Sequence, residues 1–78
     1  MKKANVQRQI GNRIKELRIA AGLTQEDVAD TVLSVRGYQK IEAGEVDLRV
    51  SSLLYIATVL KVKPEAILKG ISPVDPYS

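Results

Sequence analysis

The chain has 78 residues, a net charge of +3 at pH 7, and neither cysteine nor histidine. Its length fits one small domain, and its composition excludes disulfides and the thiolate or imidazole ligands of a zinc site, so we expect no metal or other cofactor. Because so small a core leaves a thin margin of stability, we expect support from a partner subunit.

The positive charge is concentrated at the start of the chain. Residues 1–18 hold six cations and one anion, and the other sixty residues hold six cations and eight anions. This asymmetry favours a polyanionic partner, although ordinary solubilising charge produces the same pattern. Apolar runs stay well below the roughly 18 residues of a membrane span, and the early lysines precede no signal-peptide segment. We therefore expect a cytoplasmic, nucleoid-associated protein with no membrane contact.

Apolar residues recur at helical spacing along most of the chain, and no segment alternates with the period of a strand. The first expected helix covers residues 5–20 and ends before Gly22, a residue suited to a helix stop. The second covers residues 25–32, because Thr24 and Asp27 are spaced as a capping box.

Three more helices complete the expected all-α fold. They cover residues 35–43, residues 50–60, and a short segment from Pro64 to Gly70. Ser34 is a typical cap for the third helix, and proline suits the first turn of the fifth. We expect one domain over residues 1–70 and a flexible tail over residues 71–78, where two prolines leave little to pack.

Three sequence blocks occur in an order typical of one family. They are LTQEDVAD, SVRGYQKIEAGE and LLYIATVLKVKPEAIL. Together they resemble the Xre/Cro-type helix-turn-helix family of phage and bacterial repressors over about residues 8–69. The resemblance implies a compact five-helix bundle of the lambda-repressor-like kind, in which the third helix enters the major groove of DNA.

The chain departs from the family pattern in one place. Between residues 24 and 34 it is one residue shorter, and the usual turn glycine is absent. Without this gap, Gln39 and Glu42 would take the two buried positions of the third helix; with it, Tyr38 and Ile41 do. Burying unpaired polar groups costs free energy, so the apolar register favours the gap and a tight turn.

The resemblance assigns base contacts to the third helix. Arg36 is the main candidate, because a guanidinium fork matches O6 and N7 of guanine. We expect Lys40 to contact a guanine or a phosphate, Val35 to pack on a thymine methyl, and Gly37 to let the backbone approach closely. Gln39 is expected at the flank or on a phosphate. A helix face that is merely solvated is the alternative.

Further roles follow from the same resemblance. Gln25 matches a family residue that binds phosphate and often braces the recognition helix. Ser34 is expected to cap the third helix and to donate to a phosphate, with capping alone as the alternative. Arg49 lies where relatives place a loop cation at the DNA backbone or the minor groove. Arg18 and Glu42 match a largely buried ion pair, and we interpret them as structural.

The fourth helix also indicates a partner subunit. Leu54, Tyr55 and Val59 lie outside its expected inward stripe, and exposed apolar side chains on a small domain indicate an interface. With Val46 they predict a two-fold homodimer whose recognition helices reach half-sites about 34–36 Å apart. A C-terminal tail folded over the same side chains is the alternative.

Together these features favour a sequence-specific regulator that binds double-stranded DNA, and a repressor on a palindromic operator in particular. They do not favour an enzyme, since no catalytic constellation is visible. The rival hypothesis is a protein-interaction module on the same fold. A phage repressor, a restriction-modification controller and an antitoxin that binds a toxin all remain open.

Overall fold

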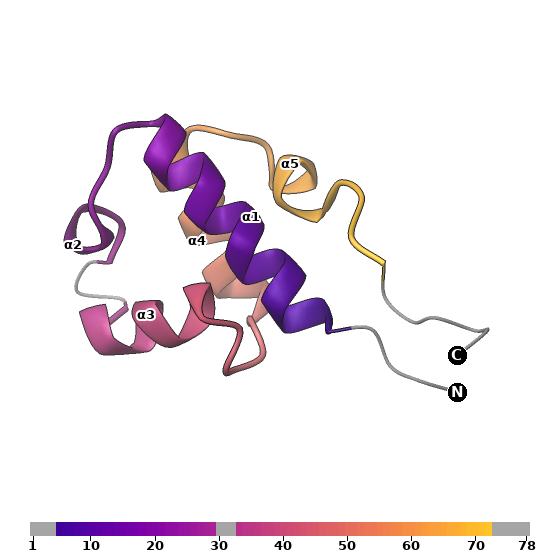
Figure 1. The fold of residues 1–78 in the computed structure, drawn as a ribbon. Helices are drawn as coiled ribbons and strands as arrows, with labels where there is room; N and C mark the ends of the chain where they lie inside the picture. The colour runs from indigo at the N-terminus through magenta and orange to yellow at the C-terminus, as the bar shows by residue number, and fades with distance from the viewer. Residues whose placement is uncertain (1–4, 30–32, 73–78) are drawn as a thin grey trace.

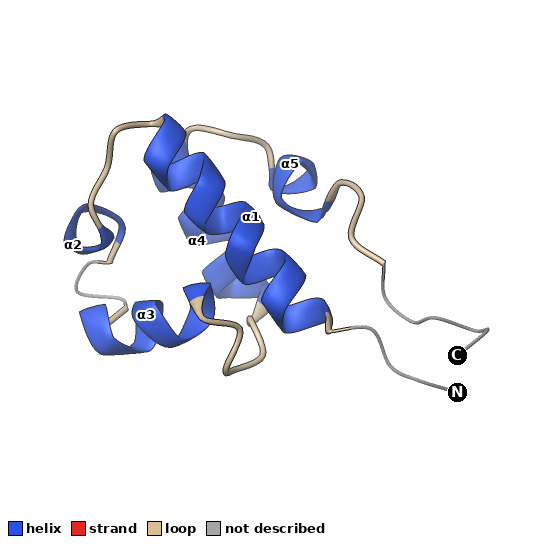
Figure 2. Ribbon diagram, viewed as in Figure 1, coloured by secondary structure: helices blue, strands red, loops and turns tan. Residues whose placement is uncertain are grey.

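The computed structural model describes residues 5–29 and 33–72, and all regular elements in these ranges are helices (Figures 1 and 2). In chain order they are α1 (Val6–Ala20), α2 (Gln25–Val28), α3 (Val35–Glu42), α4 (Val50–Leu60) and α5 (Pro64–Leu68). α1 packs against α3 and α5, α2 packs against α3 and α4, and α4 packs against α5. The expected all-α, five-helix fold is confirmed.

One fully buried side chain from each helix forms the centre of the core. These side chains are Ile14, Val28, Tyr38, Ile56 and Ile67, and each has no exposed surface. Removing an apolar side chain of this size from water contributes about 1.5–3 kcal/mol. Every helix is therefore anchored by burial, including α2 and α5, which are too short to be stable alone.

α2 and α3 each begin at a side-chain cap. The Thr24 hydroxyl accepts the Asp27 N–H at 3.1 Å, and the Asp27 carboxylate accepts the Thr24 N–H at 2.8 Å, which completes the predicted capping box. The backbone and hydroxyl of Thr24 lower the pKa of Asp27. At α3 the Ser34 hydroxyl accepts the Gly37 N–H at 2.9 Å.

The predicted extent of the second helix is wrong. α2 ends at Val28, and Ala29 is extended, with φ −71° and ψ 141°. A helix as far as residue 32 would leave only residue 33 between it and the Ser34 cap, which is too little chain to reverse direction before α3 begins. Residues 30–32, which include the far end of the predicted helix and part of its tight turn, lie outside the described residues.

The start of the predicted flexible tail is held against α1. The Gln9 side-chain amide donates to the Ser72 carbonyl at 3.1 Å, and its oxygen accepts the Ser72 N–H at 3.0 Å. The rest of the predicted tail, residues 73–78, lies outside the described residues.

Candidate nucleic-acid interface

The register of α3 decides which of its side chains face outward. Tyr38 is fully buried and Ile41 is 8% exposed, as the apolar register predicted. Arg36, Gln39 and Lys40 are exposed. Positions three and four apart share one face of a helix, so these three side chains form a single polar face.

Glu42, at the end of α3, is the one buried charged residue of the described chain, at 6% exposed. Its carboxylate accepts from Arg18 of α1 at 2.6 Å (Nε to Oε2) and 3.2 Å (Nη2 to Oε1). Arg18 also donates to the Leu23 carbonyl at 2.8 Å, and the Tyr38 hydroxyl donates to Glu42. The two residues expected to pair therefore join α1 to α3 in a two-pronged contact.

This cluster shifts the pKa values of its members. Burial on its own would raise the pKa of Glu42, but hydrogen bonds from Arg18, Tyr38 and Gln25 outweigh it and hold the pKa below its usual value. Burial, with the adjacent Glu42 charge, raises the pKa of Tyr38. At neutral pH the site thus holds a carboxylate and a protonated phenol.

Gln25 extends the cluster toward the surface of α3. Its amide nitrogen donates to Glu42 Oε1 at 3.1 Å, and its oxygen accepts from the amide nitrogen of Gln39 at 3.1 Å. Arg18, Glu42, Gln25 and Gln39 therefore form one hydrogen-bonded chain that crosses α1, α3 and α2. The link between Gln25 and Gln39 has no signature in the sequence, because it depends on how the turn before α3 folds.

The expected outward position of Val35 needs a correction. Val35, the first residue after the Ser34 cap, is half-buried and packs against the core. Gly37 is also half-buried, and a Cβ there would lie 3.0 Å from the Ser34 hydroxyl. Ser34 acts as the expected cap and remains exposed.

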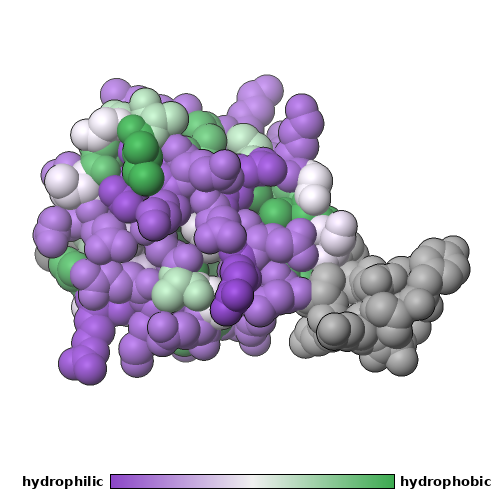
Figure 3. Space-filling view, in the orientation of Figure 1, coloured by the Kyte–Doolittle hydropathy of each residue, from purple (hydrophilic) through white to green (hydrophobic). Residues whose placement is uncertain are grey.

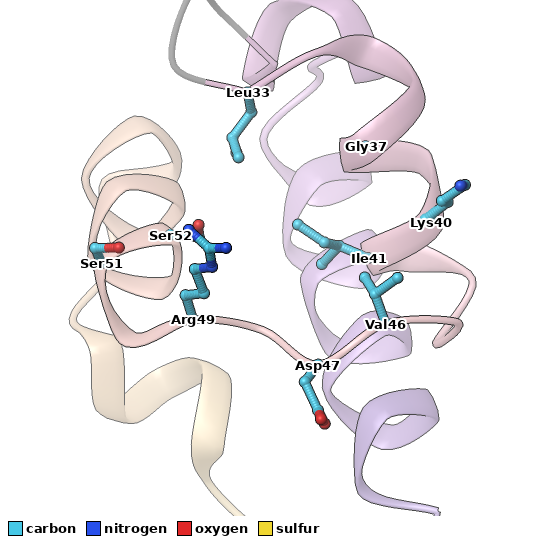
Figure 4. Close-up of a pocket in the computed structure, with 9 residues that line it drawn as sticks. All are labelled: Leu33, Gly37, Lys40, Ile41, Val46, Asp47, Arg49, Ser51 and Ser52. Atoms are coloured by element: carbon cyan, nitrogen blue, oxygen red, sulfur yellow. The ribbon is translucent and has the colours of Figure 1, made fainter.

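A recess of about 330 Å³ separates α3 from the start of α4 (Figure 4). Leu33, Ile41 and Val46 point toward it and give it an apolar floor. Arg49 rises between the two helices, whereas the end of Lys40 projects away on the far side of α3. Arg49 is the N-cap residue of α4, yet its side chain makes no capping bond.

The loop between α3 and α4 is held against α1. Gly44 has φ +74°, and a Cβ at this residue would lie 2.7 Å from the Arg8 Cα, so both conformation and close approach require glycine. The Gln7 amide donates to the Asp47 carboxylate at 2.8 Å. Asp47 therefore has a partner on its own chain, close to the loop cation Arg49.

The four apolar side chains expected at a dimer interface divide into two pairs. Val46 is 37% exposed and Leu54 is 48% exposed. Tyr55 and Val59 are half-buried and pack against the core, so they are less open than the sequence pattern indicated. Val50, which the sequence analysis missed, is 72% exposed and lies one turn before Leu54.

The face in front in Figure 3, which carries α1, is mostly hydrophilic.

In the described part of the chain, no helix combines the length and the apolar character that a bilayer crossing needs.

Comparison with known proteins shows similarity to a family, to a curated relative and to a solved structure. A family model described as helix-turn-helix matches residues 14–67, more than half of the chain. The chain is 31% identical over 61 residues to an uncharacterised prophage-derived HTH-type transcriptional regulator, YonR, of Bacillus subtilis. The match covers 77% of this chain and 56% of YonR, so the chain spans little more than half the length of YonR. It is also similar to the crystal structure of the restriction-modification controller protein C.AhdI from Aeromonas hydrophila, with a TM-score of 0.74, 31% identity, and coverage of 78% of this chain and 94% of that one.

Proposed function

This chain is a member of the helix-turn-helix family, and we propose on that premise that it is a sequence-specific regulator of transcription that represses from a palindromic operator as a homodimer. The family has a DNA-binding regulator fold and is not an enzyme class. The observation that carries the proposal is the orientation of α3: Tyr38 and Ile41 hold its inner face in the core, and Arg36, Gln39 and Lys40 share the outer face. A helix presented in this way fits the major groove, which is about 12 Å wide.

The residues around α3 then take distinct roles. Arg36 reads a guanine through O6 and N7, and Lys40 contacts a guanine or a phosphate. Gly37, which has no side chain, lets the duplex approach the backbone, and the Ser34 hydroxyl turns toward a phosphate as well as capping α3. Val35 is half-buried, so only its outer methyl group reaches a thymine.

Two residues outside α3 contact the DNA backbone. Gln25, at the start of α2, presents its backbone N–H to a phosphate, because its side chain is bonded to Glu42 and Gln39. Arg49 contacts the DNA backbone beside the recess between α3 and α4.

The test of this function is selection of binding sites from random duplexes, followed by affinity measurements at several salt concentrations. We expect one enriched palindromic sequence and a logarithmic affinity that falls with slope of about −0.9 per neutralised phosphate. Affinity that is independent of salt, or no enriched sequence, would exclude the proposal.

Arg36→Ala tests whether Arg36 reads a base or only contributes positive charge. It should weaken operator binding by about 1–3 kcal/mol and relax preference at one base pair in each half-site. Lys69→Ala is the matched control, since it removes an exposed cation at the end of α5. It should leave base preference unchanged. Equal losses for all sequences in the Arg36 variant would contradict its assigned role.

The likeness to C.AhdI favours one role among the regulators. That controller is matched over 94% of its length, whereas the prophage regulator is matched over 56%. A restriction-modification controller is therefore our preferred role, ahead of a phage repressor. A protein-interaction module on the same fold would instead lack a salt-dependent, sequence-selective duplex complex. An antitoxin that binds DNA would form that complex and would bind a toxin as well.

A further inference from the structure

We propose that the recess between α3 and α4 binds a small organic anion, and that this ligand releases the protein from DNA. The apolar part of the ligand lies on the floor of the recess, and its anionic group pairs with Arg49. The binding site stands on the geometry of the recess, whereas the release from DNA rests on the proposed function.

The floor of the recess is an apolar surface. Leu33, Ile41 and Val46 point toward it (Figure 4). Leu33 is half-buried and Val46 is 37% exposed, so both keep surface in contact with water. Because removing apolar surface from water is favourable in proportion to its area, an apolar ligand group is stabilised on this floor.

The charge at the recess is positive and comes from Arg49. Its side chain rises between the two helices and forms no ion pair with any described residue. The end of Lys40 projects away, and the Asp47 carboxylate is turned away and accepts from Gln7 at 2.8 Å. The Ser52 hydroxyl points toward Arg49 in Figure 4, and both residues line the recess. A guanidinium fork matches a carboxylate or a phosphate, and the hydroxyl adds one donor.

The size of the recess limits the ligand. Its volume of about 330 Å³ is near the lower end of the range of about 300–1,000 Å³ for small-molecule sites. Its walls are helices that the core holds in place, α3 by Tyr38 and α4 by Ile56. The recess is therefore preformed, and it fits a short carbon chain or a small ring better than a peptide.

A bound ligand and a duplex compete for the same groups. Gly37 and Lys40, which the proposed function places at the DNA, also line the recess. The anionic group neutralises Arg49 and repels a phosphate that approaches it. By linkage, the ligand weakens duplex binding by the same factor by which the duplex weakens ligand binding.

The first experiment measures ligand binding without DNA. The labelled full chain is titrated with acetate, butyrate and hexanoate at constant ionic strength and followed by two-dimensional NMR. Signals of Leu33, Ile41 and Val46 should shift, and the dissociation constant should fall roughly fourfold for each added CH₂, which corresponds to about 0.8 kcal/mol. Hexanol should bind roughly two- to fivefold more weakly than hexanoate, because it has no charge to pair with Arg49. Hexyl phosphate tests a phosphate as the anionic group.

Two variants separate the floor from the charge. Ser52→Leu should fill the recess and remove the dependence on chain length. Its matched control is Ala20→Leu, which adds the same side chain at an exposed position at the end of α1 and should bind hexanoate as the wild type does. Arg49→Gln should keep the dependence on chain length but bind hexanoate and hexanol alike. Thermal unfolding checks that each variant is folded.

The first experiment has a clear contrary outcome. Shifts that do not depend on chain length, or that spread over the exposed cations of the chain, indicate an adventitious ion only and overturn the inference. Hexanoate that fails to bind, together with weaker duplex binding by Ser52→Leu, would assign the recess to DNA alone.

The second experiment measures release from DNA by fluorescence anisotropy of the selected operator. Hexanoate at ten times its dissociation constant should weaken duplex binding roughly tenfold, against sodium chloride at equal ionic strength. Duplex binding by Ser52→Leu should not respond to hexanoate. Hexanoate that occupies the recess without weakening duplex binding overturns the release. If the wild type selects no duplex while hexanoate still binds, the proposed function fails and the binding site stands.

Discussion

At the scale of single residues, Glu42 is the side chain that links several helices through hydrogen bonds. Its carboxylate is buried, yet it accepts from Arg18, Tyr38 and Gln25, which belong to three different helices or helix ends. No buried side-chain polar atom in the described residues lacks a partner. A charge held in this way favours one arrangement of α1, α2 and α3 over others, more than it adds to stability.

The pH dependence of folding should report this carboxylate. Its pKa is lowered in the folded state, so its contribution to stability is complete above the unfolded value of about 4.3 and is lost as pH falls through the folded pKa. Thermal unfolding measured from pH 7 down to pH 3 should therefore show a steeper decline for the wild type than for Glu42→Gln. At pH 7 the variant should be less stable by about 3–5 kcal/mol, because the Arg18 side chain, which is 11% exposed, is left without a counter-charge. Parallel pH profiles would contradict this account.

At the scale of helices, two N-termini lack a side-chain cap. Arg49 precedes α4 and Lys63 precedes α5, and both backbones are extended as a capping serine requires. Arg49→Ser and Lys63→Ser should each raise the free energy of unfolding by about 0.5–2 kcal/mol, since each adds a cap and removes a cation from the positive end of a helix.

The two cap variants should differ in DNA affinity. Only Arg49 lies beside the recess next to α3. Arg49→Ser should therefore weaken binding to all duplexes alike, whereas Lys63→Ser should leave binding unchanged. Denaturant unfolding and duplex titration of the matched pair measure both effects. Equal binding by the two variants would remove Arg49 from the interface.

The crossing of α1 and α3 depends on Gly11. A Cβ at this position would lie 2.5 Å from the carbonyl oxygens of Ile41 and Glu42, which are backbone atoms and cannot rotate away. Gly11→Ala should destabilise the fold by about 1–3 kcal/mol in spite of the better helix propensity of alanine. Asn12→Ala, at the exposed neighbouring position, is the control and should cost little. An unchanged unfolding midpoint for the Gly11 variant would show that the helices separate freely.

What the sequence predicts at this scale is local. The caps at Thr24 and Ser34 act within three residues, and the inward pair Tyr38 and Ile41 follows from helical spacing. The early end of α2 does not follow from a local pattern. It is set by the distance that the short connection from α2 to α3 must cover. The half-burial of Val35 has the same origin, since the turn sets how α3 meets the core.

At the scale of the whole molecule, the exposed apolar side chains of α4 and the preceding loop should mediate dimer formation. Val50 and Leu54 are one helical turn apart, and Val46 precedes them. Sedimentation at micromolar concentration should show a dimer for the wild type and a monomer for Leu54→Glu. Ile19→Glu is a matched control, because Ile19 is 58% exposed on α1, and it should remain dimeric. A Leu54→Glu dimer would exclude this face.

The proposed DNA-binding face and the proposed dimer face were only partly predictable from sequence. Exposure of Arg36 and Lys40 follows once the inward face of α3 is known. The Gln25–Gln39 contact joins residues from two helices across a turn of unusual length, so no pattern along the chain indicates it. Val50 was missed because a residue at a helix start has no preceding turn to show whether it belongs to the inward stripe.

The Gln9–Ser72 contact has a consequence for tolerance to mutation. Both of its hydrogen bonds reach the main chain of residue 72, so the serine side chain takes no part. In a saturation scan, position 72 should accept almost any amino acid except proline, which has no N–H to donate. Position 9, by contrast, needs a long side chain with a donor and an acceptor at its tip. A position that tolerates few substitutions can thus be hydrogen-bonded to one that tolerates many.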